Sequence, residues 1–209
     1  HHGVKILDGS LVAAAVLSRM RMPDAHLQRP PFLFRRRYWV YYVLAFFFGA
    51  RKQIFITFGP WVLIRVFHQP AWIFAQLWIV ASILGVFFQP LLGRAIDRFG
   101  ERRVLMWDSV FIALICLGYG FAHRAGHPAA ALGILYACFV ADQLLFGVNM
   151  ARDTYLARIA ESPSHVAPTL SLGITINHAV SMSVPFLGGL LWVRFGHPSV
   201  FLATAGVAV

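Results

Sequence analysis

Long apolar runs, separated by short polar segments, divide the chain from residue 38 onward. A helix rises 1.5 Å per residue, so about 20 apolar residues cross the hydrocarbon core of a bilayer. Five runs reach that length, and a sixth begins near Pro198. The pattern predicts an all-α, polytopic transmembrane bundle. The five expected complete helices cover residues 38–67, 71–92, 104–122, 129–151 and 168–192.

The polar segments between these runs alternate in positive charge. Arg94, Arg98, Arg102 and Arg103 lie together in one segment, whereas the next one contains only Arg124. Arginine and lysine accumulate in cytoplasmic loops of helical membrane proteins. The alternation therefore predicts that the basic stretch before residue 38 is cytoplasmic.

The composition agrees with a membrane protein. Hydrophobic residues make up 59% of the 209 residues and charged residues 12%, against about 25% charged in soluble domains. The 18 Lys and Arg against 8 Asp and Glu do not indicate nucleic-acid binding, because the arginines lie in short loops and not on one soluble face. We expect a multi-pass protein of the bacterial inner (plasma) membrane.

Two regions differ in character. Residues 1–37 contain a short apolar stretch, Leu11 to Leu17, followed by a basic stretch, and we interpret them as the end of a preceding helix and a cytoplasmic linker. Residues 38–209 form the predicted bundle of five complete helices and the start of a sixth. The chain begins at His1 without a Met and stops inside an apolar run, so both ends are expected to be cut.

The segment Gly93 to Arg103 carries the most specific signal. It is a compact charged turn between two membrane-length apolar runs, with the spacing G-x-x-x-D-R-x-G-x-R-R. This spacing resembles the loop signature of the major facilitator superfamily of secondary transporters. Glu101 departs from the pattern, at a position where the family often has a basic residue. It weakens the local positive charge and offers a second ion pair.

The resemblance implies that this turn is a gate. In the family, the acid and the arginines form a cytoplasmic charge network that is made in one access state and broken in the other. The simpler alternative is that the charges only set the topology. Gly93 would allow close packing or a turn, Gly100 would turn the chain back, and Asp97 would accept from the nearby arginines or cap a helix. The gating candidates are Gly93, Asp97, Arg98, Gly100, Arg102 and Arg103.

The resemblance also implies that this chain is one half of a transporter. Family members join two six-helix halves by a long cytoplasmic linker, which residues 18–37 resemble. This favours the second, C-terminal half over the first half, which usually carries the stronger version of the motif. The missing other half would then be a partner within the same polypeptide.

Polar residues at membrane depth mark a second candidate site. An ionisable group inside a span needs a partner or a water-filled cavity. Adjacent helical residues point about 100° apart, so Arg51 and Lys52 cannot share one contact, and the simplest arrangement pairs Asp142 with one of them. The hypothesis is a central cavity for substrate and a coupling proton, and the alternative is a static ion pair with amide and imidazole groups joining helices. The candidates are Arg51, Lys52, Gln53, Asp142, Gln143, Asn177 and His178.

Other chemistry is not indicated. Asp108 lies near the cytoplasmic end of its run, where we expect it to pair with loop arginines. Cys116 and Cys138 lie within apolar runs and have no metal-ligand spacing. The sequence has no phosphate-binding loop and no catalytic motif, so we expect no cofactor, no metal and no enzyme activity.

These observations predict a secondary active transporter. It would move a small solute by alternating access, as a symporter or antiporter coupled to protons, within a lipid bilayer and without nucleic acid. The alternative is a polytopic membrane sensor, scaffold or membrane enzyme without transport activity.

Overall fold

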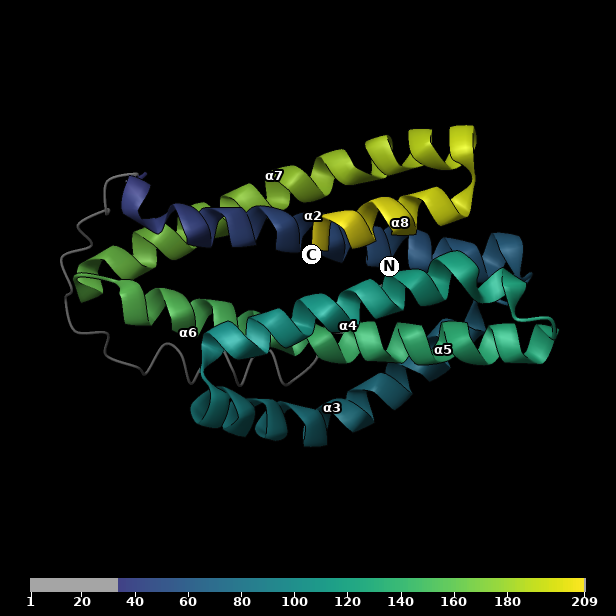
Figure 1. Cartoon of the computed structure of the whole chain (residues 1–209), viewed down its shortest axis with the longest axis horizontal. Coiled ribbons are helices and arrows are strands. Elements are labelled where there is room, and N and C mark those ends of the chain that lie inside the picture. The colour runs from purple at the N-terminus through teal and green to yellow at the C-terminus, as the bar shows by residue number, and fades with distance from the viewer. Residues whose placement is uncertain (1–33, 209) are drawn as a thin grey trace, which may run out of the picture. The chain divides into compact units, whose positions relative to one another are not determined.

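A computed structural model describes residues 34–208, with side chains to residue 206. This part of the chain is helical and contains no strand, which confirms the predicted all-α class. Short 3-10 segments adjoin several of the helices. The predictions for residues 1–33, including the apolar stretch at Leu11 to Leu17, lie outside the described residues. The α-helices are α2 (Trp39–Trp61), α3 (Trp72–Phe99), α4 (Glu101–Phe121), α5 (Pro128–Leu145), α6 (Asn149–Ile159), α7 (Pro163–Phe195) and α8 (His197–Ala208) (Figure 1).

Four helical stretches of the described chain are long and apolar enough to cross a membrane. They are α3, α4 with the turn that follows it, α5 together with α6, and α7. Helix α2 has 23 residues and continues as a π-helix over Val62–Val66, but the polar residues Arg51, Lys52 and Gln53 interrupt its apolar run. A membrane-spanning α2 therefore stays a prediction from the sequence pattern.

The charged turn between α3 and α4 is much shorter than expected. Helix α3 continues to Phe99 and α4 begins at Glu101, so only Gly100 separates them. The residues from Gly93 to Phe99 include no proline, and the Gly100 N–H donates to the Ile96 carbonyl at 2.9 Å to close the helix. Gly100 adopts φ +82°, a conformation that favours glycine. The predicted loop was wrong because hydropathy marks the apolar part of a helix and not its charged last turns.

The polar segment between α5 and α7 is also largely helical. Helix α5 passes through a 3-10 turn at Phe146–Val148 into α6, which ends at Ile159. Helix α7 starts at Pro163 and not at residue 168, because Ser162 caps it and proline is favoured at the first helical position. Arg152 and Arg158, predicted to lie in a loop, are therefore both on α6, where Arg152 is buried and Arg158 is exposed.

Helices α2 and α7 pack at close range (Figure 1). A Cβ on Gly49 of α2 would lie 2.6 Å from the backbone oxygen of Asn177 on α7. The Ser181 hydroxyl of α7 donates to the Gly49 carbonyl oxygen at 3.1 Å. Small residues and hydroxyl-to-carbonyl bonds are typical of close helix packing within membranes. This contact sets the position of the polar residues that flank Gly49.

An aromatic cluster fills the interior between α2, α4 and α8. The Tyr119 and Phe201 rings stack with centroids 4.7 Å apart, and Phe55 lies 5.8 Å from Tyr119. These three side chains are buried. Helix α8 therefore belongs to the same packed unit as α4.

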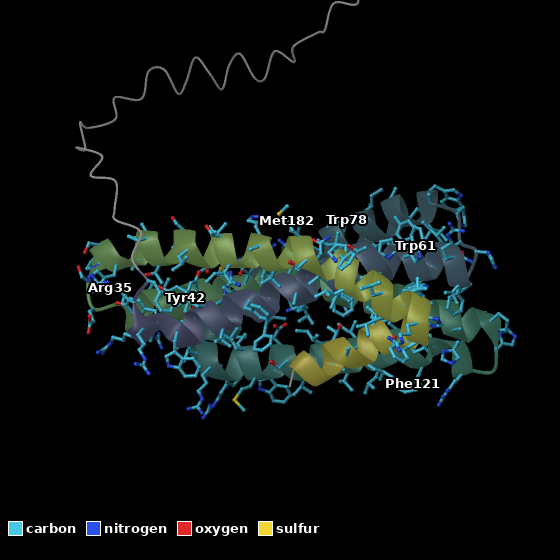
Figure 2. All side chains as sticks on the ribbon, turned by 90° about the horizontal axis from the view of Figure 1, so that it is seen from above. Arg35, Tyr42, Trp61, Trp78, Phe121 and Met182 are labelled. Carbon is cyan, nitrogen blue, oxygen red and sulfur yellow. The ribbon has the colours of Figure 1, made fainter. Side chains whose placement is uncertain are left out.

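Large apolar side chains also cover the outside of the bundle. Figure 2 labels Trp61, Trp78, Phe121 and Met182 at its surface, and all four are exposed. Helix α3 is exposed along much of its length. Continuous apolar surface of this kind is unfavourable in water and suits contact with lipid or with further apolar helices. Together with the four long apolar helices, it indicates an integral membrane protein.

Candidate functional site

A buried arginine joins three helices near the middle of the bundle. Arg51 of α2 donates through Nη1 to Asp108 Oδ2 of α4 at 2.9 Å. Its Nη2 lies 3.7 Å from Asp142 Oδ1 of α5. The three side chains are only 7%, 12% and 6% exposed, respectively. The Arg51 guanidinium also lies 5.9 Å from the ring centroids of Phe48 and Phe146, so apolar walls surround the cluster.

The cluster contains the expected pair and one unexpected member. Asp142 faces Arg51, as the burial cost of both groups suggests. The expectation that Asp108 pairs with loop arginines was wrong. Asp108 lies seven residues after Glu101, about 10 Å along α4 at 1.5 Å per residue, and it faces α2 instead of the helix end.

The neighbouring Lys52 points to a different helix. Its Nζ donates to Asn177 Oδ1 of α7 at 3.1 Å. Arg51 and Lys52 therefore diverge as adjacent helical residues must: one contacts α4 and α5, the other α7. Gln53 bonds within α2, to the Thr57 hydroxyl at 3.0 Å.

The remaining cavity candidates lie elsewhere. His178 is exposed and does not line the cavity that contains Arg51. Gln143 lines a second hollow, of about 870 Å³, with Trp78, Gln89 and Met150. Five of the seven candidates are thus divided among the Arg51 cluster, the α2–α7 contact and this second hollow, whereas Gln53 bonds within α2 and His178 is exposed.

The Arg51 cluster borders a cavity of about 710 Å³ formed by α2, α4, α6, α7 and α8. Most of its wall is apolar, including Phe47, Leu105 and Leu187. Large, mainly apolar cavities with a few polar groups are the usual form of small-molecule sites. The charged and amide side chains of its lining are Arg51, Asp108, Asn149 and Arg152.

Arg152 of α6 was not among the candidates. It lies three residues after Asn149 on one helix, so the two share a face. Asn149 also follows Asp142 by seven residues, which is two helical turns. That spacing was the available signal, and it was missed because Arg152 was assigned to a loop.

The gating candidates lie where α3 ends and α4 begins, on helical residues on both sides of Gly100. Asp97 and Arg98 are exposed in the last turn of α3, and Arg102 and Arg103 are exposed in the first turn of α4. Among residues 34–208, Asp97 makes none of the expected ion pairs with these arginines. Gly93 is helical with open space around its Cβ position, so the expectation that it allows close packing was wrong.

The ion pair at this end of the bundle involves Glu101. Its Oε2 accepts from Arg158 Nη1 of α6 at 2.9 Å. The Glu101 side chain is 5% exposed, whereas that of Arg158 is 70% exposed. The residue that departs from the family pattern thus joins α4 to α6.

Metal and thiol chemistry find no support among the described residues. No three His, Cys, Asp or Glu side chains of residues 34–208 could hold one ion together. Cys116 and Cys138 are both free thiols. The charged and amide groups that line the cavity are one carboxylate, one amide and two guanidinium groups.

Comparisons with known proteins give distant relatives. The chain is 23% identical over 146 residues to "Putative bacilysin exporter BacE" of Bacillus amyloliquefaciens, covering 70% of this chain and 35% of that protein. It is 26% identical over 78 residues to the protein of the same name from Bacillus subtilis (strain 168), covering 37% of this chain and 20% of that protein. The chain thus spans about a third or less of the length of these curated relatives. No family model and no solved structure matches it.

The class of protein follows from the fold and these relatives together. Apolar helices of membrane length indicate an integral membrane protein, and the chain is distantly similar to proteins that bear the name of a bacilysin exporter.

Proposed function

We propose that this chain is one six-helix half of a major-facilitator-type secondary transporter of the bacterial inner membrane. The basic stretch before residue 38 favours the C-terminal half. It would move a small solute by alternating access, coupled to protons. The distant relatives are named as exporters, so we propose outward transport. The spacing from Gly93 to Arg103 supports the family, and the Arg51 cluster supports the coupling.

The charge count of the Arg51 cluster is the observation that carries the proposal. Two buried carboxylates, Asp108 and Asp142, face one guanidinium. If both carboxylates are ionised, the cluster has an excess negative charge in an apolar environment, which is costly. One added proton neutralises this excess negative charge. Arg51 keeps a carboxylate partner whether or not the proton is bound. This arrangement suits a residue that takes up and releases a proton during a transport cycle.

Asp142 is the better candidate for the exchangeable proton. Its distance to Arg51 is 3.7 Å, whereas Asp108 lies at hydrogen-bond distance, 2.9 Å. Protonation of Asp142 would weaken the attraction between α5 and α2 while Asp108 still holds α2 to α4. Proton uptake would thereby favour a different position of α5 relative to the other two helices.

The charged turn would act as the cytoplasmic gate. Asp97, Arg98, Arg102 and Arg103 are exposed at one end of α3 and α4, where the other half of a transporter could contact them. Ion pairs with that half would form in one access state and break in the other. The ion pair between the buried Glu101 and the exposed Arg158 would join α4 to α6 in both states.

Transport by the full-length parent protein in proteoliposomes tests the proposal. Solutes of several classes, bacilysin among them, are screened with and without an imposed pH gradient. We expect gradient-driven transport that Asp142→Asn abolishes, while exchange of labelled for unlabelled solute continues. The control is Arg124→Gln, which removes an exposed charge outside the cluster. Asp97→Asn should slow both gradient-driven transport and exchange, because a gate serves both.

Two results would contradict the proposal. Normal gradient-driven transport by both Asp142→Asn and Arg51→Gln would exclude the cluster from coupling. Absence of any transport by folded, inserted protein would favour the sensor or scaffold alternative.

A further inference from the structure

Arg152 is a buried cation without an adequate partner. The residue is 6% exposed, and its Nε and Nη1 atoms are buried without a hydrogen-bond acceptor. The nearest carboxylate contact is with Asp153, at 3.7 Å, and the Asp153 side chain is 42% exposed. A buried guanidinium that lacks acceptors is costly. Arg51 also has two buried donor atoms without an acceptor, but its charge faces two buried carboxylates, one of them hydrogen-bonded.

Aromatic rings hold the Arg152 guanidinium in place. Its central carbon lies 4.6 Å from the Phe48 ring centroid and 5.7 Å from that of Tyr41. A guanidinium over an aromatic face is stabilised by the ring, and its N–H groups lie in the guanidinium plane, where they can bind a planar acceptor. The side chain is thus positioned while two of its donor atoms lack an acceptor.

The surroundings of Arg152 define what could bind there. Arg152 lines the 710 Å³ cavity, and so does Asn149, whose Oδ1 is also buried without a partner. The rest of the wall is mostly apolar. The other cation of the cavity, Arg51, is offset by two carboxylates, so Arg152 is the place in this cavity that favours a negative charge.

We propose that Arg152 binds the carboxylate of an amphipathic solute whose apolar part occupies this cavity. The inference rests on the proposed function, since it names the solute class of that transporter. A planar carboxylate matches the in-plane donors of a guanidinium. A dianion such as phosphate would bring a second charge into an apolar cavity with one unbalanced cation. The class is therefore a monocarboxylate.

Binding to the purified full-length protein tests this without requiring transport. The probes are 4-phenylbutyrate, its neutral amide 4-phenylbutyramide, and phenyl phosphate, each titrated calorimetrically. We expect the carboxylate to bind at least about tenfold more tightly than the amide, as for a charge-assisted hydrogen bond. Phenyl phosphate should bind more weakly than the carboxylate.

Variants assign the preference to Arg152. Arg152→Gln should reduce carboxylate affinity to the level of the amide, with amide affinity unchanged. Arg152→Lys keeps the charge but loses the planar guanidinium, so it should retain part of the preference for carboxylate over amide. This variant also tests the inference if Arg152→Gln does not fold. Arg194→Gln, an exposed arginine outside the cavity, should retain all of it.

Several outcomes would overturn the inference. These are equal affinity for acid and amide, no binding of any probe, phosphate binding as tight as carboxylate binding, or a preference that survives in both Arg152 variants. Proton-driven transport of an uncharged solute alongside any of these results would leave the proposed function intact and remove only the assignment of Arg152.

Discussion

Arg51 and Asp108, 57 residues apart in the chain, form a hydrogen-bonded ion pair of 2.9 Å in the interior of the bundle. The pair connects α2 to α4, and Asp142 of α5 completes a group of one cation and two anions. Groups of this kind cost more when one member is removed than they contribute when complete.

Removing the cation should be the most damaging change to this cluster. Arg51→Gln leaves two carboxylates without a counter-charge, and we expect a loss of about 3–5 kcal/mol in the free energy of unfolding. Asp142→Asn should cost less, because its oxygen is 3.7 Å from Arg51. Chemical unfolding in detergent micelles measures both. A loss for Arg51→Gln no larger than that for Asp142→Asn would contradict the assigned charge balance.

The buried Glu101 provides a second, asymmetric prediction. Arg158→Gln removes the partner of a 5% exposed carboxylate, so it should lower the free energy of unfolding by about 1–3 kcal/mol. Glu101→Gln leaves only an exposed arginine without its partner and should cost less. The double variant should be close to Glu101→Gln alone. Additive losses in the double variant would show that the two residues do not interact.

The α2–α7 contact predicts a strong effect of a single methyl group. Gly49→Ala would place a Cβ against the backbone of Asn177, and backbone cannot move aside as a side chain can. We expect a loss of about 1–3 kcal/mol in the free energy of unfolding. The control is Gly189→Ala on α7, which meets nothing within 4 Å. Equal stability of the two variants would mean that α2 and α7 are further apart than described.

The pairing of His197 with His123 predicts that the stability of the folded protein depends on pH. His197 lies at the start of α8, outside the four candidate spans, with its ring 5.5 Å from that of His123. Burial, and secondly the proximity of His123, lower the pKa of His197 below its ordinary value. The unfolded chain therefore binds a proton more readily than the folded one. The stability that His197 contributes is present above about pH 6.5 and is lost as pH falls through the folded pKa.

Comparing the pH dependence of variants tests this. Between about pH 7.5 and pH 5.5, the unfolding temperature of wild type should drop more than that of His197→Gln. His123→Gln should have an intermediate drop, because it removes only the smaller cause. An identical drop in wild type and His197→Gln would exclude His197 as a source of the pH dependence.

The sequence predicted the helices of the bundle more accurately than their ends. Each apolar run is long because hydrocarbon must be crossed, so hydropathy finds the run. Hydropathy does not find the charged helical turns that extend beyond the apolar run, such as Arg94 to Phe99 or Arg152 to Ile159. Charged residues form helix equally well in water. Both stretches were assigned to loops for this reason.

The site was predicted in part, also for physical reasons. A buried charge requires a partner, which was enough to pair Asp142 with either Arg51 or Lys52, and the structure places Arg51 there. The rotation of each helix about its axis decides which carboxylate lies closest, and a run that is apolar on all sides does not determine that rotation. Asp108 was therefore assigned to the wrong arginines, and Arg152 was assigned to the wrong environment.

The single residue between α3 and α4 has a mechanical consequence. From Trp72 to Phe121, Gly100 is the one residue of the described chain outside a helix. With only its backbone torsions available, α3 and α4 cannot slide past each other and can change only their mutual angle. A displacement of α4 that starts at Asp108 must then reach α3 as a rotation about Gly100. The two helices would rotate as rigid bodies about Gly100, and the charged residues lie next to that hinge.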